Sequence, residues 1–136
     1  MKYPVSIEKD GQTFMARFVD IPEALTCGDT YEEALQEAQD ALLTAFEFYF
    51  EDQCPVPMPS PLEDRAYVTV PASVWAKVLL LNTMLTERVT QAELAKRIGS
   101  RKQEMQRIIN LGHNTKIDTL NKALEAMGKH LNISVS

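Results

Sequence analysis

Cysteine, histidine and glycine are all scarce in this 136-residue chain, and each scarcity excludes a kind of site. The two cysteines, Cys27 and Cys54, have no metal-like spacing and do not build a disulfide framework, so reduced, buried or idle thiols are predicted. The two histidines complete no Ser-His-Asp or Cys-His pattern, and the five glycines form no phosphate-binding loop. We therefore predict no enzyme active site, no metal site and no cofactor.

Long apolar runs are also missing. No stretch approaches the ~20 apolar residues that span a bilayer. The first residues, MKYPVSIEKDG, lack the apolar core of a signal peptide. We therefore expect a soluble protein that stays in the cytoplasm.

Basic residues are scarce in the first half of the chain only. Residues 1–64 hold three basic and fourteen acidic side chains, a net charge of −11. Residues 65–136 hold eleven basic and five acidic side chains, a net charge of +6, so the formal charge of −5 conceals a division. Such asymmetry suggests two partners of opposite sign. The basic half suits a polyanion such as DNA, and the acidic half suits a basic protein.

Alternating hydrophobicity and turn residues predict a small α+β domain over residues 1–70. Asp10-Gly11 between two alternating runs is a strong hairpin signal. Thr30, with Glu33 at the capping-box position, begins a long helix, and a proline-rich stretch then forbids regular structure. The strands are predicted over residues 3–8, 13–19, 24–27 (an edge strand) and 66–70. The expected order is therefore β-β-β-α-β.

Residues 71–136 are predicted to form a helical domain. Within it, residues 90–112, TQAELAKRIGSRKQEMQRIINLG, contain two short helices with a break at Gly99, where glycine permits the turn. Thr90 and Glu93 stand at capping-box positions of the first helix. Two short helices joined in this way favour a DNA-binding arrangement.

The second of these helices carries two distinct faces. Met105 and Ile108 face inward. The opposite stripe recurs at i, i+3, i+4 and i+7 and consists of Gln103, Gln106, Arg107 and Asn110. Long amides and a guanidinium on one stripe can read base edges in a major groove. Base contacts are predicted from Gln103, Gln106 and Arg107. Backbone positioning is predicted from Gln91, Arg101, Lys102, Asn110, His113 and Lys116. A merely polar surface helix, and a solvated loop position for His113, are the alternatives.

The end of the chain predicts one more helix and a strand. Thr115 is placed to cap the helix, with Asp118 three residues later. Residues 130–136 then alternate Leu131, Ile133 and Val135, which predicts a strand without a neighbour in a helical domain. An unpaired strand edge invites self-pairing, so we expect this strand to pair with its copy in a second chain.

Residues 90–112 resemble the helix-turn-helix of the phage-repressor type. The resemblance rests on Gln91, Ala92, Leu94, Ala95, Gly99, Met105 and Ile108. That family usually places Ser or Thr at the start of the recognition helix, where this chain has Arg101 or Lys102. The helix start is therefore expected to be less well capped, and the two cations suit contact with phosphate.

The order of elements, together with the motif DIPEALTCGDTYEEAL over residues 20–35, resembles the HicB antitoxin family. Many members have Pro-Gly where this chain has Glu23-Ala24. The resemblance covers the entire chain, because one branch of the family carries a C-terminal helix-turn-helix. It implies a partial ribonuclease-H-like fold for residues 1–70 and a helix-turn-helix and dimerisation domain for residues 71–136.

The same resemblance implies a function. The first domain would neutralise a HicA-type toxin, a small basic protein that cleaves mRNA. The second would repress its own operon by binding operator DNA as a homodimer or higher even oligomer. The implied toxin-binding residues are the acidic side chains Glu32, Glu33, Glu37, Asp40 and Glu47. A solubilising helix face is the alternative for these carboxylates.

Two other functions remain as rivals. A one-component regulator with a small-molecule-sensing first domain would need convergent polar groups in an apolar cavity, which the sequence does not show. A metal-dependent nuclease would need clustered carboxylates on strands. The early strands offer Glu8, Asp10 and Asp20, but no carboxylate stands at the centre of a strand with a partner.

Overall fold

The computed structural model describes all residues, Met1–Ser136, in two compact units. Unit 1 comprises Met1–Glu51 and Val56–Pro71, and unit 2 comprises Asp52–Pro55 and Ala72–Ser136. The fold is α+β, with one four-stranded antiparallel sheet and five helices. Unit 1 carries four basic and thirteen acidic side chains, and unit 2 carries ten basic and six acidic ones. The division of charge therefore coincides with the division into units.

The sheet of unit 1 has the strand order β3-β2-β1-β4, with every neighbouring pair antiparallel. The strands are β1 (Lys2–Asp10), β2 (Thr13–Phe18), β3 (Leu25–Gly28) and β4 (Tyr67–Thr69). The hairpin and the edge position of the third strand are confirmed. Lys9 and Asp10, however, pair with Phe14 and Thr13, so the loop is Gly11-Gln12 rather than the four residues 9–12 left between the predicted strands. The ladder therefore extends two pairs beyond the predicted end of the first strand.

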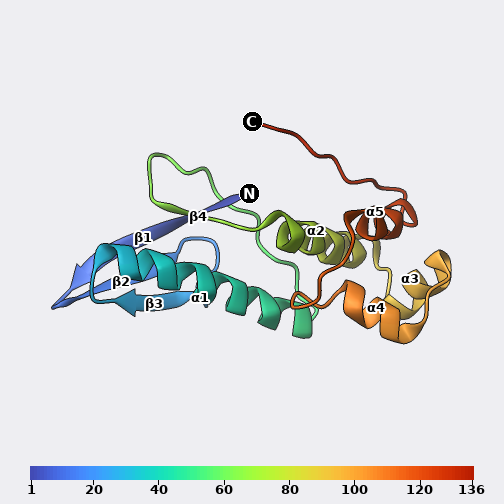
Figure 1. The fold of residues 1–136 in the computed structure, drawn as a ribbon, viewed down its shortest axis with the longest axis horizontal. Helices are drawn as coiled ribbons and strands as arrows, with labels where there is room; N and C mark the ends of the chain where they lie inside the picture. Colours follow the sequence, from blue (N-terminus) through green and yellow to red (C-terminus); the bar gives the residue numbers. More distant parts are fainter. The chain divides into compact units, whose positions relative to one another are not determined.

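Helix α1 (Tyr31–Glu51) packs against one face of this sheet (Figure 1). Its predicted cap is confirmed, because the Thr30 hydroxyl accepts from the Glu33 amide at 3.1 Å. The Glu33 carboxylate in turn accepts from the Asp29 amide at 3.0 Å. Gly28 allows β3 to run directly into the helix, since a Cβ atom there would lie 2.5 Å from the Ala34 nitrogen.

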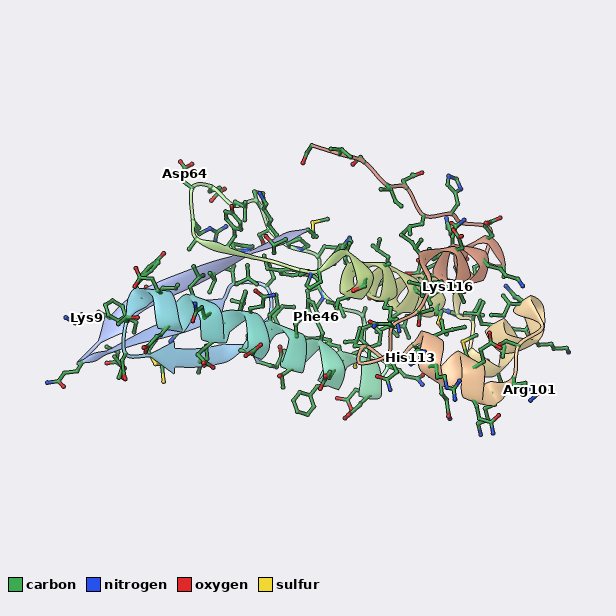
Figure 2. The ribbon with its side chains drawn as sticks, viewed as in Figure 1. Lys9, Phe46, Asp64, Arg101, His113 and Lys116 are labelled. Carbon is green, nitrogen blue, oxygen red and sulfur yellow. The ribbon has the colours of Figure 1, made fainter.

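The core of unit 1 lies between the sheet and α1. Its buried residues include Tyr3, Val5, Ala16, Phe18, Ile21, Ala34, Ala38, Leu42, Ala45 and Phe46. The Tyr3 ring meets Phe46, labelled in Figure 2, edge to face at 5.6 Å, and its hydroxyl donates to the Pro57 carbonyl at 2.7 Å. Burial raises the pKa of Tyr3, so it donates throughout the physiological range. The proline-rich segment is thus tied to the core.

Unit 2 is helical. Its helices are α2 (Ala72–Glu87), α3 (Gln91–Ile98), α4 (Lys102–Ile108) and α5 (Ile117–Glu125). All four contribute to one core, which includes Leu80, Met84, Leu94, Met105, Ile108, Leu120 and Leu124. The helices predicted in this part of the chain are confirmed.

The predicted cap of α5 is wrong. Lys116, with φ −61° and ψ 138°, is the capping residue, and its side chain makes no capping hydrogen bond. The helix begins one residue too late for the Thr115 hydroxyl to reach its first amides, and that oxygen is buried without a hydrogen-bond partner. The start of α5 therefore lacks a side-chain cap.

Residues 130–136 form no strand within the single chain (Figure 1). Leu131 packs against the core of unit 2, and its amide donates to the Asn121 side chain at 2.8 Å. Ile133 and Val135 are 73% and 99% exposed. A strand needs a neighbour to hydrogen-bond with, and one chain supplies none here. Pairing with a second copy stays a prediction.

The structure also bears on the predictions for the cysteines and for membrane-spanning segments. Both cysteines are free and exposed, so among the expected reduced, buried or idle thiols only the buried alternative is wrong. Each helix is either too short or too polar to traverse a lipid bilayer.

Candidate functional site

The break between α3 and α4 is built by local hydrogen bonds. Thr90, in an extended conformation, caps α3, and its hydroxyl accepts from the Glu93 amide at 3.1 Å. The Glu93 carboxylate pairs with Arg97 at 3.1 Å instead of returning to the helix start. Gly99 ends α3 with φ +68°, a left-handed conformation that glycine adopts without strain. The Ser100 amide then donates to Ala95 at 2.9 Å, which turns the chain towards α4.

Helix α4 has one buried and one exposed face. Met105 and Ile108 are 1% and 2% exposed. Arg101 caps the helix from an extended conformation, and its side chain makes no capping hydrogen bond, as the sequence predicts. Gln103, Gln106 and Arg107 are all exposed on the other side of the helix, together with Lys102. The helix therefore presents amides and cations to solvent.

The predicted DNA-binding residues gather around two hollows of unit 2. Five of them line the first, between α4 and the start of α5: Arg101, Gln103, Arg107, His113 and Lys116. Figure 2 labels Arg101 at the start of α4 and His113 beyond its end. Gln91 and Lys102 line the second, beside α3. Gln106 and Asn110 line neither hollow.

Two charged residues of these hollows were missed by sequence reasoning. Lys96 lies on α3 beside Gln91 and Lys102, and adds a cation to the second hollow. Glu104 lies in the first turn of α4, lines the first hollow, and adds a negative charge beside Arg101. The sequence could have indicated that Lys96 is exposed, because it lies outside the apolar positions of its helix. Glu104 has a plain local reason, since a carboxylate at a helix start is favoured by the helix dipole.

The expectation that Asn110 continues the helical stripe is wrong. Helix α4 ends at Ile108, and Asn110 lies in the following turn. Its side-chain oxygen accepts from the Gly112 amide at 2.8 Å, so this side chain shapes the turn. Asn110 is nevertheless exposed and follows the capping residue Ile109.

The candidate partner surface of unit 1 is the outer face of α1. The five predicted acidic residues, Glu32, Glu33, Glu37, Asp40 and Glu47, are all exposed. All except Glu32 recur at spacings that place them on one side of the helix, opposite the buried alanines.

Two residues of this face were missed. Glu51 continues the stripe at the same spacing, and Phe48 beside it is 58% exposed. The stripe from Glu33 to Glu51 extends for about 27 Å at ~1.5 Å per residue. The helical spacing of the sequence could have placed both residues on this side of α1.

The carboxylates of the early strands were considered above as possible metal ligands. Asp20 accepts from the Ser60 amide at 2.8 Å and from the Ser60 hydroxyl, and so holds the proline-rich segment. No group of three or more His, Cys, Asp or Glu side chains lies close enough together to hold a metal ion. A hollow on the outer face of the sheet is lined mainly by polar residues, including Glu8, Lys9 and Arg17. It is unlike the apolar cavities that hold small ligands.

Comparison with known proteins identifies relatives along the chain. Residues 2–79 match the family described as HicB_like antitoxin of bacterial toxin-antitoxin system. Antitoxin HicB 2 of Photorhabdus laumondii is 59% identical over 133 residues, which cover 98% of this chain and 95% of that protein. Antitoxin HicB of Escherichia coli K12 is 53% identical over 135 residues, or 98% of both chains. Antitoxin HicB of Pseudomonas fluorescens is 34% identical over 136 residues, covering 98% of this chain and 93% of that protein.

Proposed function

The chain belongs to the family of HicB-like antitoxins, and from this premise we propose two separate binding functions for its two units. Unit 1 binds and neutralises a HicA-type toxin, a small basic ribonuclease. Unit 2 binds operator DNA and represses the chain's own operon. The observation that carries the proposal is the separation of an exposed acidic helix face and an exposed basic face into different compact units.

The DNA-binding part of the proposal treats α3 and α4 as a helix-turn-helix with α4 as the recognition helix. Three features support it: the cap and glycine turn of α3, the buried Met105 and Ile108, and the exposed amides and cations opposite them. In such motifs the exposed face enters the major groove. Gln103, Gln106 and Arg107 would contact bases. Gln91, Arg101, Lys102, Asn110, His113 and Lys116 would contact the backbone.

The toxin-binding part rests on α1. Its acidic stripe faces solvent over about five helical turns, ~5.4 Å each, and Phe48 offers an apolar contact beside it. An acidic surface steers a basic partner into a complex, and an exposed aromatic residue is typical of a binding hot spot. We propose toxin contacts from Glu32, Glu33, Glu37, Asp40 and Glu47, and also from Glu51 and Phe48, because both are exposed on this part of α1.

An electrophoretic mobility shift with the chain's own promoter fragment tests the DNA function. Wild-type protein is expected to retard this fragment at low salt in preference to a scrambled one. Gln106→Ala and Arg107→Ala should each weaken operator binding by ~1–3 kcal/mol, about 5- to 150-fold, and relax sequence preference.

Gln36→Ala is the matched control, because Gln36 is an exposed amide on α1. It should leave the shift unchanged. Operator binding that is unaffected by both α4 substitutions would rule out α4 as the recognition helix. No retardation of the promoter fragment by wild-type protein at low salt would defeat the DNA function itself.

A further inference from the structure

Lys77, in the middle of α2, is the only charged side chain buried in the molecule, at 2% exposure. Its ammonium nitrogen donates to three backbone carbonyls of unit 2. They are those of Arg107 at 3.1 Å, Asn110 at 2.6 Å and His113 at 2.6 Å. One side chain thus connects the last turn of α4 to the segment that follows it.

The chemistry of this contact is complementary. An ammonium group has three N–H donors and no acceptor, and it meets three oxygens that only accept. The carbonyls at the end of a helix lack partners within the helix, and their dipoles attract a cation. A buried charge is tolerated only where it is hydrogen-bonded in this way.

The three residues whose carbonyls bind Lys77 also carry exposed side chains on the candidate DNA face. We propose that Lys77 is a positioning residue, which fixes the end of α4 and residues 109–113 so that Arg107, Asn110 and His113 are presented to DNA together. This inference rests on the proposed operator binding. Lys77 itself, being buried, contacts no phosphate.

The contact also predicts a pH dependence. Burial lowers the pKa of Lys77 from 10.5 to about 8, and no charged side chain contributes to this shift. The ionisable residues that face Lys77 with their carbonyls are Arg107 and His113, and their side chains point to solvent. A neutral amine keeps two donors for three carbonyls, so one hydrogen bond is lost as pH rises through about 8.

The stability of the whole fold changes with pH in the opposite direction to the local hydrogen bonding of Lys77. Between about pH 8 and 10.5 the unfolded chain binds more protons at Lys77 than the folded chain does. Raising the pH therefore increases the contribution of Lys77 to the stability of the folded state. If Lys77 only stabilised the fold, operator affinity would stay constant or increase as the pH rises. If Lys77 positions the binding face, operator affinity falls over the same pH range.

Operator affinity of the full chain, measured by fluorescence anisotropy from pH 7 to 9.5, tests the inference. Lys77→Met should lose about tenfold in affinity at pH 7, because the binding face is no longer preorganised. Its affinity should also lack the step near pH 8 that wild-type protein shows. Lys129→Met is the matched control, since Lys129 is exposed in the same unit and pairs only loosely with Glu87, at 3.9 Å. Lys77→Met behaving like Lys129→Met would overturn the inference.

Amide hydrogen exchange keeps the test decisive if Lys77→Met does not fold or if wild-type protein does not bind the operator. In wild-type protein, the protection of residues 109–114, corrected for intrinsic exchange, should fall between pH 7 and 9.5. Protection that stays constant would refute the positioning role. Absence of operator binding by wild-type protein together with falling protection would defeat the proposed function and leave the structural role of Lys77 intact.

Discussion

At the scale of single residues, two cations of unit 2 serve the fold. Lys77 binds three carbonyls around the end of α4. Arg97 pairs with Glu93 at 3.1 Å and donates to the Ala126 carbonyl at 3.2 Å, which ties α3 to the end of α5. A count of basic residues therefore overstates the charge that unit 2 can offer to phosphate. The cations of the two hollows provide the better measure.

Gly28 is expected to tolerate no side chain. A Cβ atom there would lie 2.5 Å from the Ala34 nitrogen and 2.8 Å from the Glu33 carbonyl carbon, and both are backbone atoms that cannot move aside cheaply. Gly28→Ala should therefore lower the free energy of unfolding by ~1–3 kcal/mol in urea denaturation.

Gly11→Ala is the control for that substitution. Gly11 has open space around its Cβ position, but its φ of +64° makes alanine mildly strained. A loss of ~1–2 kcal/mol is expected, from the left-handed conformation alone. A larger loss at Gly11 than at Gly28 would show that close packing does not determine the cost at Gly28.

Signals that lie within a few residues of one another predicted much of this fold. Thr30 with Glu33, Thr90 before α3, and Gly99 after it all occupy the roles that their local sequence indicates. The cap at Thr115 failed because a shift of one residue moves the hydroxyl out of reach. Lys77 could not be predicted at all, since its three acceptors lie 30, 33 and 36 residues further along the chain.

At the scale of elements, α4 depends on its neighbours. A seven-residue helix is too short to be stable alone, and its start lacks a side-chain cap. Met105 and Ile108 anchor it in the core, and Lys77 holds its last turn. Because these contacts secure the buried side and the end, the exposed side can carry polar residues without loss of the helix's anchoring.

The exposed face of α1 is acidic, and charge reversal tests whether this face binds the toxin. Glu37→Lys combined with Asp40→Lys reverses the centre of the acidic stripe while leaving the buried face intact. We expect affinity for a co-expressed HicA-type toxin to fall by ~10- to 100-fold, because opposite charges are replaced by like charges at the interface. Isothermal titration calorimetry would measure the loss.

Glu8→Lys combined with Asp64→Lys changes the net charge by the same amount at exposed sites outside α1. This control separates a specific surface from general attraction. If both double variants lose affinity equally, net charge alone recruits the toxin. If neither loses affinity, α1 is not the binding face.

At the scale of the whole molecule, the exposed tail and the proposed DNA function point to a paired assembly. Operator-binding motifs of this type usually act as two-fold dimers with half-sites ~34–36 Å apart or a multiple of it. Residues 130–136 leave Ile133 and Val135 exposed after Leu131 has joined the core. Antiparallel pairing of two such tails would satisfy their backbone groups and cover these side chains.

Substitutions on the two sides of the tail test this pairing. Ile133→Asp with Val135→Asp places charges on the apolar side of the proposed strand and should convert a dimer to a monomer in light scattering. Losing the second half-site should then weaken operator binding by ~10²-fold or more, since linked binding sites add avidity. Asn132→Asp with Ser134→Asp adds the same charge on the alternate side and should preserve the dimer. Equal loss in both variants would mean that charge repulsion, not a paired strand, acts on the tail. A dimer that survives both would place the dimer interface elsewhere in the chain.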